Sequence, residues 1–237
     1  MTLDKRVVMI TGVTGSLGPT AARRFAEQGA NLVFVGSSAE RLEALGQTLN
    51  LPEERWLSVA AVLSQPDAAK RVLDASLEKF GHVDILLHLV GGHIGGKPVP
   101  QVTEDEVSTM LQQHLWTTFH LAQVLVPHMS ANSWGRLIVI TSPSAGAPPA
   151  NGLPYAIGKT AEEALMLTLA EELKGTGVTA NIIRVRMIDT NHERDREKTP
   201  RTVSWTTPEE ISEALLYLCS DEARMVNGAR IPLYGSP

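Results

Sequence analysis

Short apolar segments alternate with longer amphipathic segments along the whole chain. The short segments are rich in valine, isoleucine and leucine without alternating polar positions, which is typical of strands buried on both faces of a parallel sheet. The longer segments repeat apolar residues at helical spacing. We predict seven strands, at residues 7–11, 31–35, 56–62, 84–90, 137–141, 179–185 and 229–233.

Helical segments separate the strands, and they cover residues 19–28, 39–49, 66–80, 103–128, 155–174 and 208–220. Two of them begin with a capping box, in which Thr103 precedes Glu106 and Thr207 precedes Glu210. Strand followed by helix, repeated to the end, predicts an α/β fold of the Rossmann type. We expect one domain over residues 1–237, a doubly wound, seven-stranded parallel sheet with helices on both faces.

Two helical segments, 107–126 and 156–173, carry apolar residues on more than one side. One apolar stripe is enough to pack a helix on a sheet. The extra width predicts a subunit interface in a homotetramer or homodimer, or else complete burial of these helices within a monomer.

Glycines occupy the turn between the first strand and the first helix, Thr-Gly-Val-Thr-Gly-Ser-Leu-Gly at residues 11–18. Glycine lets a backbone turn tightly and approach a pyrophosphate, and the following helix N-terminus offers unpaired N–H groups. In the first strand–helix unit, this pattern predicts a dinucleotide site. The expected contacts are Gly12, Thr14, Gly15, Ser16, Leu17 and Gly18.

A tyrosine and a lysine, Tyr155 and Lys159, lie one helical turn apart, and Ser142 ends the preceding strand. Tyrosine is a weak acid with a pKa of about 10, and a nearby lysine cation lowers such a pKa by about 1–3 units. Tyr155 can then exchange a proton with a carbonyl or alcohol oxygen, while Ser142 stabilises charge on that oxygen.

These motifs together resemble the short-chain dehydrogenase/reductase family, in its single-domain form, over nearly the whole chain. The resemblance implies an oxidoreductase that transfers a hydride between NAD(P)(H) and a carbonyl or alcohol substrate. It implies Tyr155 as general acid and base, Lys159 as the group that lowers its pKa and contacts the nicotinamide ribose, and Ser142 as the holder of the substrate oxygen. It also places Gly91 and Thr190 against the cofactor.

The chain departs from the family pattern at several positions. Ser16 replaces the middle glycine of the turn, Val62 stands where an aspartate usually holds adenine, and residues 88–91 read His-Leu-Val-Gly in place of Asn-Asn-Ala-Gly. Val185-Arg186 replaces a Pro-Gly pair. These losses mark a divergent member and keep a second function open, that of a non-catalytic dinucleotide-binding or scaffold protein.

The family's relay asparagine in the long helix aligns with His114. Histidine both donates and accepts hydrogen bonds and titrates near neutrality. His114 therefore either replaces the asparagine in a catalytic proton relay or is simply a packed side chain.

Cofactor preference depends on the end of the second strand, where NAD-binding members carry an aspartate and this chain has Gly36. Ser37 and Ser38 follow, with Arg41 within reach of a 2′-phosphate. The missing carboxylate favours NADP(H) over NAD(H). Alternatively, the serines serve only to cap the next helix.

The charge and composition of the chain limit the kinds of partner that it is expected to bind. The 237 residues carry a formal net charge of −5 without a basic stripe, which argues against nucleic acid or an anionic membrane surface. One cysteine and no signal or membrane-spanning segment predict a cytoplasmic protein, and the histidines form no pattern typical of a metal site. The charged segment 191–198 is either a solvated loop or a lid that admits a polar substrate.

Overall fold

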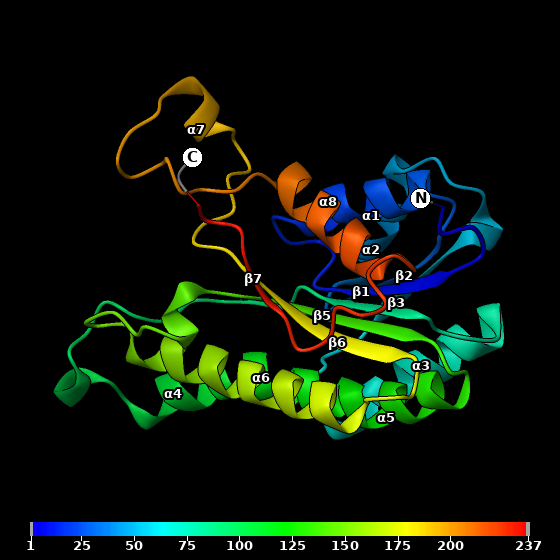
Figure 1. Cartoon of the computed structure of the whole chain (residues 1–237), viewed down its shortest axis with the longest axis horizontal. Coiled ribbons are helices and arrows are strands. Elements are labelled where there is room, and N and C mark those ends of the chain that lie inside the picture. The colour runs from blue at the N-terminus through cyan, green and yellow to red at the C-terminus, as the bar shows by residue number, and fades with distance from the viewer. Residues whose placement is uncertain (1, 236–237) are drawn as a thin grey trace.

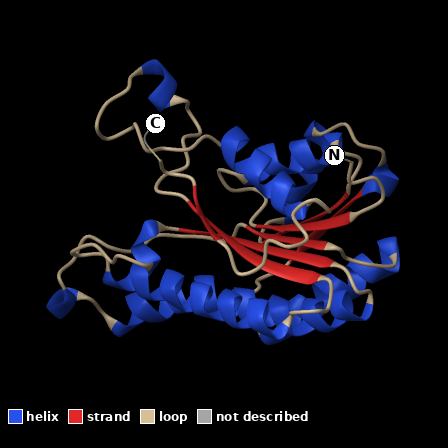
Figure 2. Ribbon diagram, in the orientation of Figure 1, coloured by secondary structure: helices blue, strands red, loops and turns tan. Residues whose placement is uncertain are grey.

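The computed structural model describes residues 2–235, which form a sheet of seven parallel strands (Figures 1 and 2). The strand order is β3-β2-β1-β4-β5-β6-β7, so the chain winds outward in both directions from the β1–β4 pair. This confirms the predicted Rossmann-like fold. The strands are β1 (Val7–Thr11), β2 (Asn31–Gly36), β3 (Trp56–Ala60), β4 (Ile85–His88), β5 (Gly135–Thr141), β6 (Val178–Arg184) and β7 (Arg230–Pro232).

Helices cover both faces of this sheet (Figure 1). One face carries α1 (Gly18–Glu27), α2 (Ala39–Thr48) and α8 (Pro208–Cys219), and the other carries α3 (Pro66–Phe80), α4 (Glu104–Leu111), α5 (Thr117–Ala131) and α6 (Leu153–Glu172). Successive residues of β1 enter opposite cores, Val7 and Met9 on one side and Val8 and Ile10 on the other. Because both faces are covered, the four residues of the strand before Thr11 are all apolar, which explains its continuous apolar pattern.

Both predicted capping boxes are present, at the starts of α4 and α8. The strand and helix bounds differ from the prediction by a few residues, as at β4, which ends at His88 rather than Val90. Short 3₁₀ turns occupy Glu53–Arg55, Val99–Gln101 and Pro143–Ala145. The segment expected as a loop or lid contains a short helix, α7 (Glu193–Arg196). The carboxylate of Asp189 accepts the backbone N–H groups of Glu193 and Arg194 at 2.9 Å each, which caps this turn.

The predicted helix at 103–128 is interrupted by a π-helical turn over Gln112–Trp116, between α4 and α5. Two threonines explain how the turn is stabilised. The Thr117 hydroxyl donates to the carbonyl of Gln113 at 2.7 Å, and the Thr118 hydroxyl donates to that of His114 at 2.6 Å. These hydroxyls satisfy carbonyl groups at a point where the α-helical ladder is broken.

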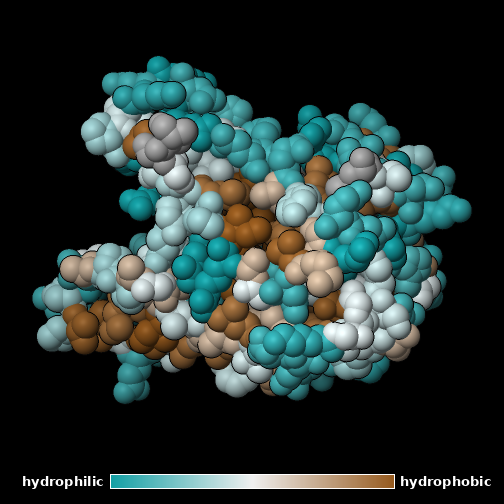
Figure 3. Space-filling model, in the orientation of Figure 1, coloured by the Kyte–Doolittle hydropathy of each residue, from teal (hydrophilic) through white to brown (hydrophobic). Residues whose placement is uncertain are grey.

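The loops after the strand ends, the segment around α7 and the start of α6 gather at one end of the molecule (Figure 1). In the space-filling view this end is hollowed between the part that carries α7 and the part that carries α4 and α6 (Figure 3). A hydrophobic area lies on the α4–α6 side of the same view.

Candidate active site

Two positions in the glycine turn after β1 leave no room for a side chain. Gly12 has φ +68°, and a Cβ there would lie 2.9 Å from the backbone of Leu89. A Cβ on Gly18 would lie 1.9 Å from the carbonyl oxygen of Val13. The helix α1 that follows starts without a side-chain cap, unlike α2, α4 and α8. Its first N–H groups therefore remain available for an anion.

Two adjoining cavities lie along the carboxyl ends of the strands. Their volumes are about 730 Å³ and about 580 Å³. Both are lined by the glycine turn and the end of β4, through Gly12, Gly15, Leu89, Val90 and Gly91. A long cavity that bends over a tight glycine turn and an uncapped helix N-terminus fits a dinucleotide. Thr14 lines the first cavity, and Ser16 and Leu17 line the second.

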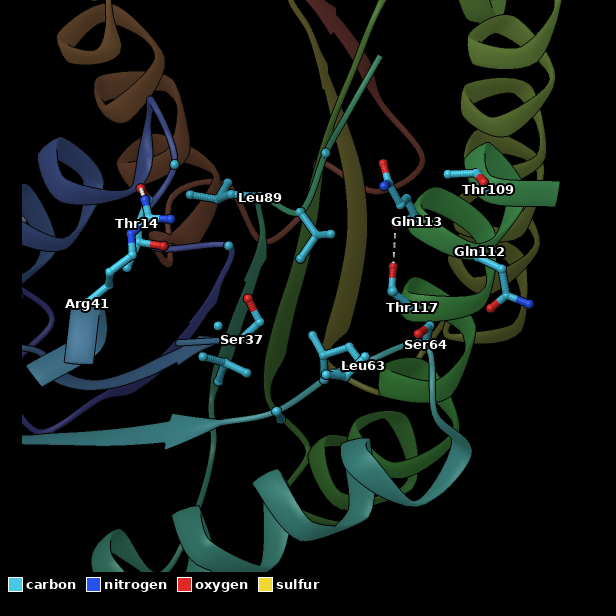
Figure 4. A pocket seen from close by; sticks show the side chains of 18 of the residues that line it. Thr14, Ser37, Arg41, Leu63, Ser64, Leu89, Thr109, Gln112, Gln113 and Thr117 are labelled. Atoms are coloured by element: carbon cyan, nitrogen blue, oxygen red, sulfur yellow. Dashed lines mark hydrogen bonds between the residues drawn. The ribbon is translucent and has the colours of Figure 1, made fainter. Parts of the chain in front are cut away.

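The first cavity extends from the end of β2 to α4 (Figure 4). Gly36, Ser37, Arg41 and Val62 line it, and the Arg41 guanidinium donates to the carbonyl of Thr14 at 2.8 Å. Ser38, which was predicted to contact the cofactor, does not line this cavity. Its hydroxyl instead caps α2 by accepting the Arg41 N–H at 3.3 Å, so one of the two serines has the capping role that the sequence left open.

The second cavity brings together the four predicted catalytic residues, Ser142, Tyr155, Lys159 and His114. Ser142 follows β5, and its oxygen accepts the N–H of Ser144 at 3.2 Å. Tyr155 and Lys159 lie on the first turns of α6. The ring of Tyr155 packs edge-on against His114, with 5.6 Å between the ring centroids. These four side chains therefore line one cavity.

Lys159 is almost entirely buried, with 3% of its surface exposed. Its ammonium donates to the carbonyl of Ile140 and to the carboxylate of Glu162, at 2.8 Å each. Sequence reasoning missed Glu162, although a carboxylate three positions after a lysine on a helix is a recognisable pairing signal.

His114 lies in the π-helical turn and is completely buried. Its Nε2–H donates to the carbonyl of Gly92 at 3.2 Å, so the proton is on Nε2, and Nδ1 has no hydrogen-bond partner among the described residues. Burial, followed by the charge of Lys159, lowers the pKa of His114 to about 3. The ring is therefore neutral at physiological pH, with one acceptor nitrogen free.

A second buried histidine, His88, was noted in the sequence only as a departure from a motif. Its Nδ1 lies 2.7 Å from the hydroxyl of Thr11 and its Nε2 lies 3.0 Å from that of Thr117. Because the Thr117 proton is directed to the carbonyl of Gln113, His88 donates from Nε2 and accepts at Nδ1 from Thr11. His88 thus joins β1, β4 and the π-helical turn, and burial lowers its pKa to about 3.

Thr190 does not line either cavity. It is exposed and follows Asp189 at the base of the segment that carries α7. The residues that line the second cavity include Val185, Arg186, Met187 and Ile188. The family's Pro-Gly position is therefore part of the cavity wall, where this chain presents Val185 and Arg186.

Residues 2–235 contain no cluster of three or more histidine, cysteine or carboxylate side chains that could hold a metal ion. Within the same range, no helix is both long enough and apolar enough to span a bilayer.

Comparisons with known proteins identify the family of this chain. The family model for short chain dehydrogenases matches residues 6–201. An uncharacterised oxidoreductase of Staphylococcus epidermidis is 30% identical over 188 residues, which cover 79% of this chain and 80% of the relative. Meso-2,3-butanediol dehydrogenase of Serratia marcescens is 27% identical, with 99% and 95% covered.

Among solved structures, 3-ketoacyl-(acyl-carrier-protein) reductase from Brucella melitensis, complexed with NADH, superposes with a TM-score of 0.86. The two chains are 25% identical, with 98% of this chain and 97% of the reductase covered. By its sequence, its fold and the side chains gathered in the second cavity, this chain belongs to the short-chain dehydrogenase family, whose members are oxidoreductases that use NAD(P)(H).

Proposed function

We propose that the protein reduces a carbonyl, or oxidises the corresponding alcohol, at the second cavity with NADP(H) as the preferred cofactor. The observation that carries this proposal is the convergence of Ser142, Tyr155 and Lys159 on a cavity continuous with the glycine turn. The dinucleotide, when bound, supplies or accepts the hydride at the substrate carbon. The residues of this chain must then handle the substrate oxygen and its proton.

Tyr155 is the proton donor to the carbonyl oxygen in reduction and the acceptor in oxidation. Ser142 donates its hydroxyl hydrogen to the same oxygen and stabilises the charge that develops there. Lys159 holds a positive charge next to both groups, in a site whose burial strengthens its field. His114 packs against the Tyr155 ring and offers its free Nδ1 as a hydrogen-bond acceptor.

The proposed activity can be tested without knowing the natural substrate. Binding of NADPH and NADH is followed by the fluorescence of the four tryptophans, and a panel of ketones, aldehydes and alcohols is then screened for cofactor oxidation or reduction. Cofactor binding with turnover of at least one compound supports the proposal. Tight binding without turnover of any compound favours the alternative of a non-catalytic dinucleotide-binding protein.

We expect NADPH to bind about tenfold more tightly than NADH, because an exposed charge-assisted contact to a 2′-phosphate contributes about 1.5 kcal/mol. Gly36, Ser37 and Arg41 line the first cavity together and carry no carboxylate to repel that phosphate. Gly36→Asp should reverse the preference. The substitution is sterically mild, since a Cβ at Gly36 would lie 3.3 Å from the flexible end of Leu42.

Comparative titrations of the parent, Gly36→Asp and Arg41→Gln measure this preference. Arg41→Gln should weaken NADPH binding and leave NADH binding unchanged. Equal affinities of the parent for the two cofactors would refute the NADP(H) assignment.

We also propose self-association through α4, α5 and α6. Packing within one chain leaves some apolar residues of these helices, and of the π-helical turn between α4 and α5, partly exposed. They include Val107, Leu111, Leu115, Trp116, Phe119, Ile157 and Leu165. Light scattering should therefore give a mass two or four times the 25.6 kDa of one chain.

Leu165→Glu on α6 should dissociate the oligomer, because a charge would enter its apolar contact. Tyr217→Glu on α8 is the matched control, since Tyr217 is 51% exposed on the opposite face of the sheet. It should leave the association through α6 intact. A parent particle of 25.6 kDa at micromolar concentration would contradict the proposal.

A further inference from the structure

A buried carboxylate, that of Glu162, lies next to the proposed catalytic group. Glu162 follows Lys159 by one turn of α6, and its side chain is completely buried. One carboxylate oxygen lies 2.8 Å from the Lys159 ammonium and the other 3.2 Å from the Thr118 hydroxyl. Because α6 and α5 both enclose it, the carboxylate has no access to solvent with which to screen its charge.

Lys159 has three N–H groups, and two of them are donated to other groups of the protein. One is donated to the carbonyl of Ile140 and one to Glu162. A single donor is left for the cavity that Lys159 and Tyr155 line together. Glu162 therefore fixes where the ammonium sits and how many of its donors can turn toward Tyr155.

The other titratable groups around this pair do not replace Glu162 as the counter-charge of Lys159. His88 on β4 and His114 in the π-helical turn are neutral near pH 7, because burial lowers the pKa of each to about 3. Glu163, the next residue on α6, receives the guanidinium groups of Arg184, at 2.8 Å, and Arg230, at 3.0 Å. Its charge is already matched on the side of β6 and β7.

Burial raises the pKa of the Glu162 carboxyl, whereas the Lys159 charge and hydrogen bond oppose that rise. An ion pair at 2.8 Å favours the charged form of both partners. The negative charge of an ionised Glu162 lowers the positive electrostatic potential that Lys159 produces at Tyr155. Tyrosinate is then less stabilised than it would be by an unpaired lysine.

We propose, on the basis of the function proposed above, that Glu162 is a positioning residue that anchors Lys159 and offsets its charge, and so keeps Tyr155 in its protonated, proton-donating form. As a consequence, the site favours carbonyl reduction near neutral pH. Reduction needs the phenol form of Tyr155 and oxidation needs its phenolate form. The pH dependence of both reactions therefore follows the ionisation of Tyr155. Alcohol oxidation should therefore reach its maximum only under alkaline conditions.

The test measures the ionisation of Tyr155 directly, in the full-length protein with and without NADP⁺. Tyrosine labelled with ¹³C at Cζ gives one signal for each of the three tyrosines, and the signal lost in Tyr155→Phe identifies Tyr155. Glu162→Gln keeps the shape and the acceptor oxygen but removes the charge. It should move the ionisation of Tyr155 to lower pH by about 1 unit, the smaller end of the shift that a nearby charge produces.

Three further variants separate charge from structure. Glu162→Asp retains the charge and should titrate close to the parent, and Glu162→Met should shift in the same direction as Glu162→Gln. Glu163→Gln is the matched control, a neighbouring buried carboxylate that does not contact Lys159. It should lower Tm without moving the Tyr155 titration.

An unchanged or alkaline-shifted Tyr155 titration in folded Glu162→Gln and Glu162→Met would overturn the inference. So would an equal shift in Glu163→Gln. Because this readout needs no turnover, it is independent of the substrate. If this inference alone fails, Tyr155 remains the proposed acid. An active Tyr155→Phe enzyme would instead contradict the proposed function itself.

Discussion

Tyr155→Phe should reduce kcat by at least about 10²-fold, because general acid catalysis contributes about 10²–10⁴-fold. Phenylalanine retains the ring that packs at 4.9 Å from His93 and at 5.6 Å from His114, measured between centroids. Only the proton donor is lost, so the fold and the affinity for NADPH should stay close to those of the parent. Retention of more than about a tenth of the activity on a genuine substrate would exclude Tyr155 as the acid.

Lys159 offers a contrasting variant, but the structure changes how it must be made. Lys159→Ala should lower both turnover and cofactor affinity, and high pH should partly restore oxidation because tyrosinate can then form unaided. It also leaves Glu162 as a buried charge without its partner, which typically costs about 3–5 kcal/mol of stability. The double variant Lys159→Met/Glu162→Met removes both charges together and separates loss of catalysis from loss of fold.

The pH profile of the two variants distinguishes their roles. Raising the pH cannot rescue Tyr155→Phe, since phenylalanine has no proton to lose. The double variant should recover part of its oxidation rate as tyrosinate forms. Rescue of neither protein, with both folded, would mean that Tyr155 ionisation does not limit the reaction.

The fold was predictable because it depends on local patterns. Strands buried on both faces are mostly apolar, and the threonine–glutamate capping boxes at Thr103 and Thr207 mark helix starts by their own side chains. Residues that follow strand ends in a parallel sheet must share one edge. This is why Gly12, Gly91 and Ser142 line one cavity in the structure, as expected.

Features that depend on partners distant in sequence were not predictable in the same way. The π-helical turn is linked to the sheet by His88 on β4, which lies 29 positions before Thr117. Nothing in the local pattern shows that Glu162 is buried, because an amphipathic helix usually presents a glutamate to solvent. Likewise, only the structure shows which of the two serines, Ser37 or Ser38, caps α2.

Acidification should destabilise the protein between about pH 6.5 and pH 3, and the loss should begin before most carboxylates are protonated. His88 and His114 have pKa values of about 3 in the folded chain, against an ordinary value of 6.5. Between these two pKa values the two histidines are protonated in the unfolded chain and neutral in the folded chain. Stability is therefore complete above pH 6.5 and falls as the pH decreases.

The physical reason is the burial of His88. Desolvation disfavours the charged imidazolium in this fully buried site, and the nearby charge of Lys159 adds to the effect. For each histidine, the free energy of unfolding should fall by about 2 kcal/mol between pH 6.5 and pH 4.5. Each pH unit below the unfolded pKa contributes about 1.4 kcal/mol to this loss. Such a loss is a large part of the about 5–15 kcal/mol that stabilises a typical domain.

His88→Asn isolates this effect, because asparagine does not titrate and keeps a polar group at the Nδ1 position, next to the Thr11 hydroxyl. Urea unfolding at pH 6.5 and pH 4.5 measures the free energy of unfolding of the parent and the variant. The acid-induced loss should be about 2 kcal/mol smaller in His88→Asn, since carboxylates common to both proteins cancel in the difference. His192→Asn, at an exposed histidine on the segment that carries α7, is the control and should reproduce the parent. An identical acid-induced loss in the parent and His88→Asn would show that His88 takes up its proton without unfolding, and that its burial is not the source of acid sensitivity.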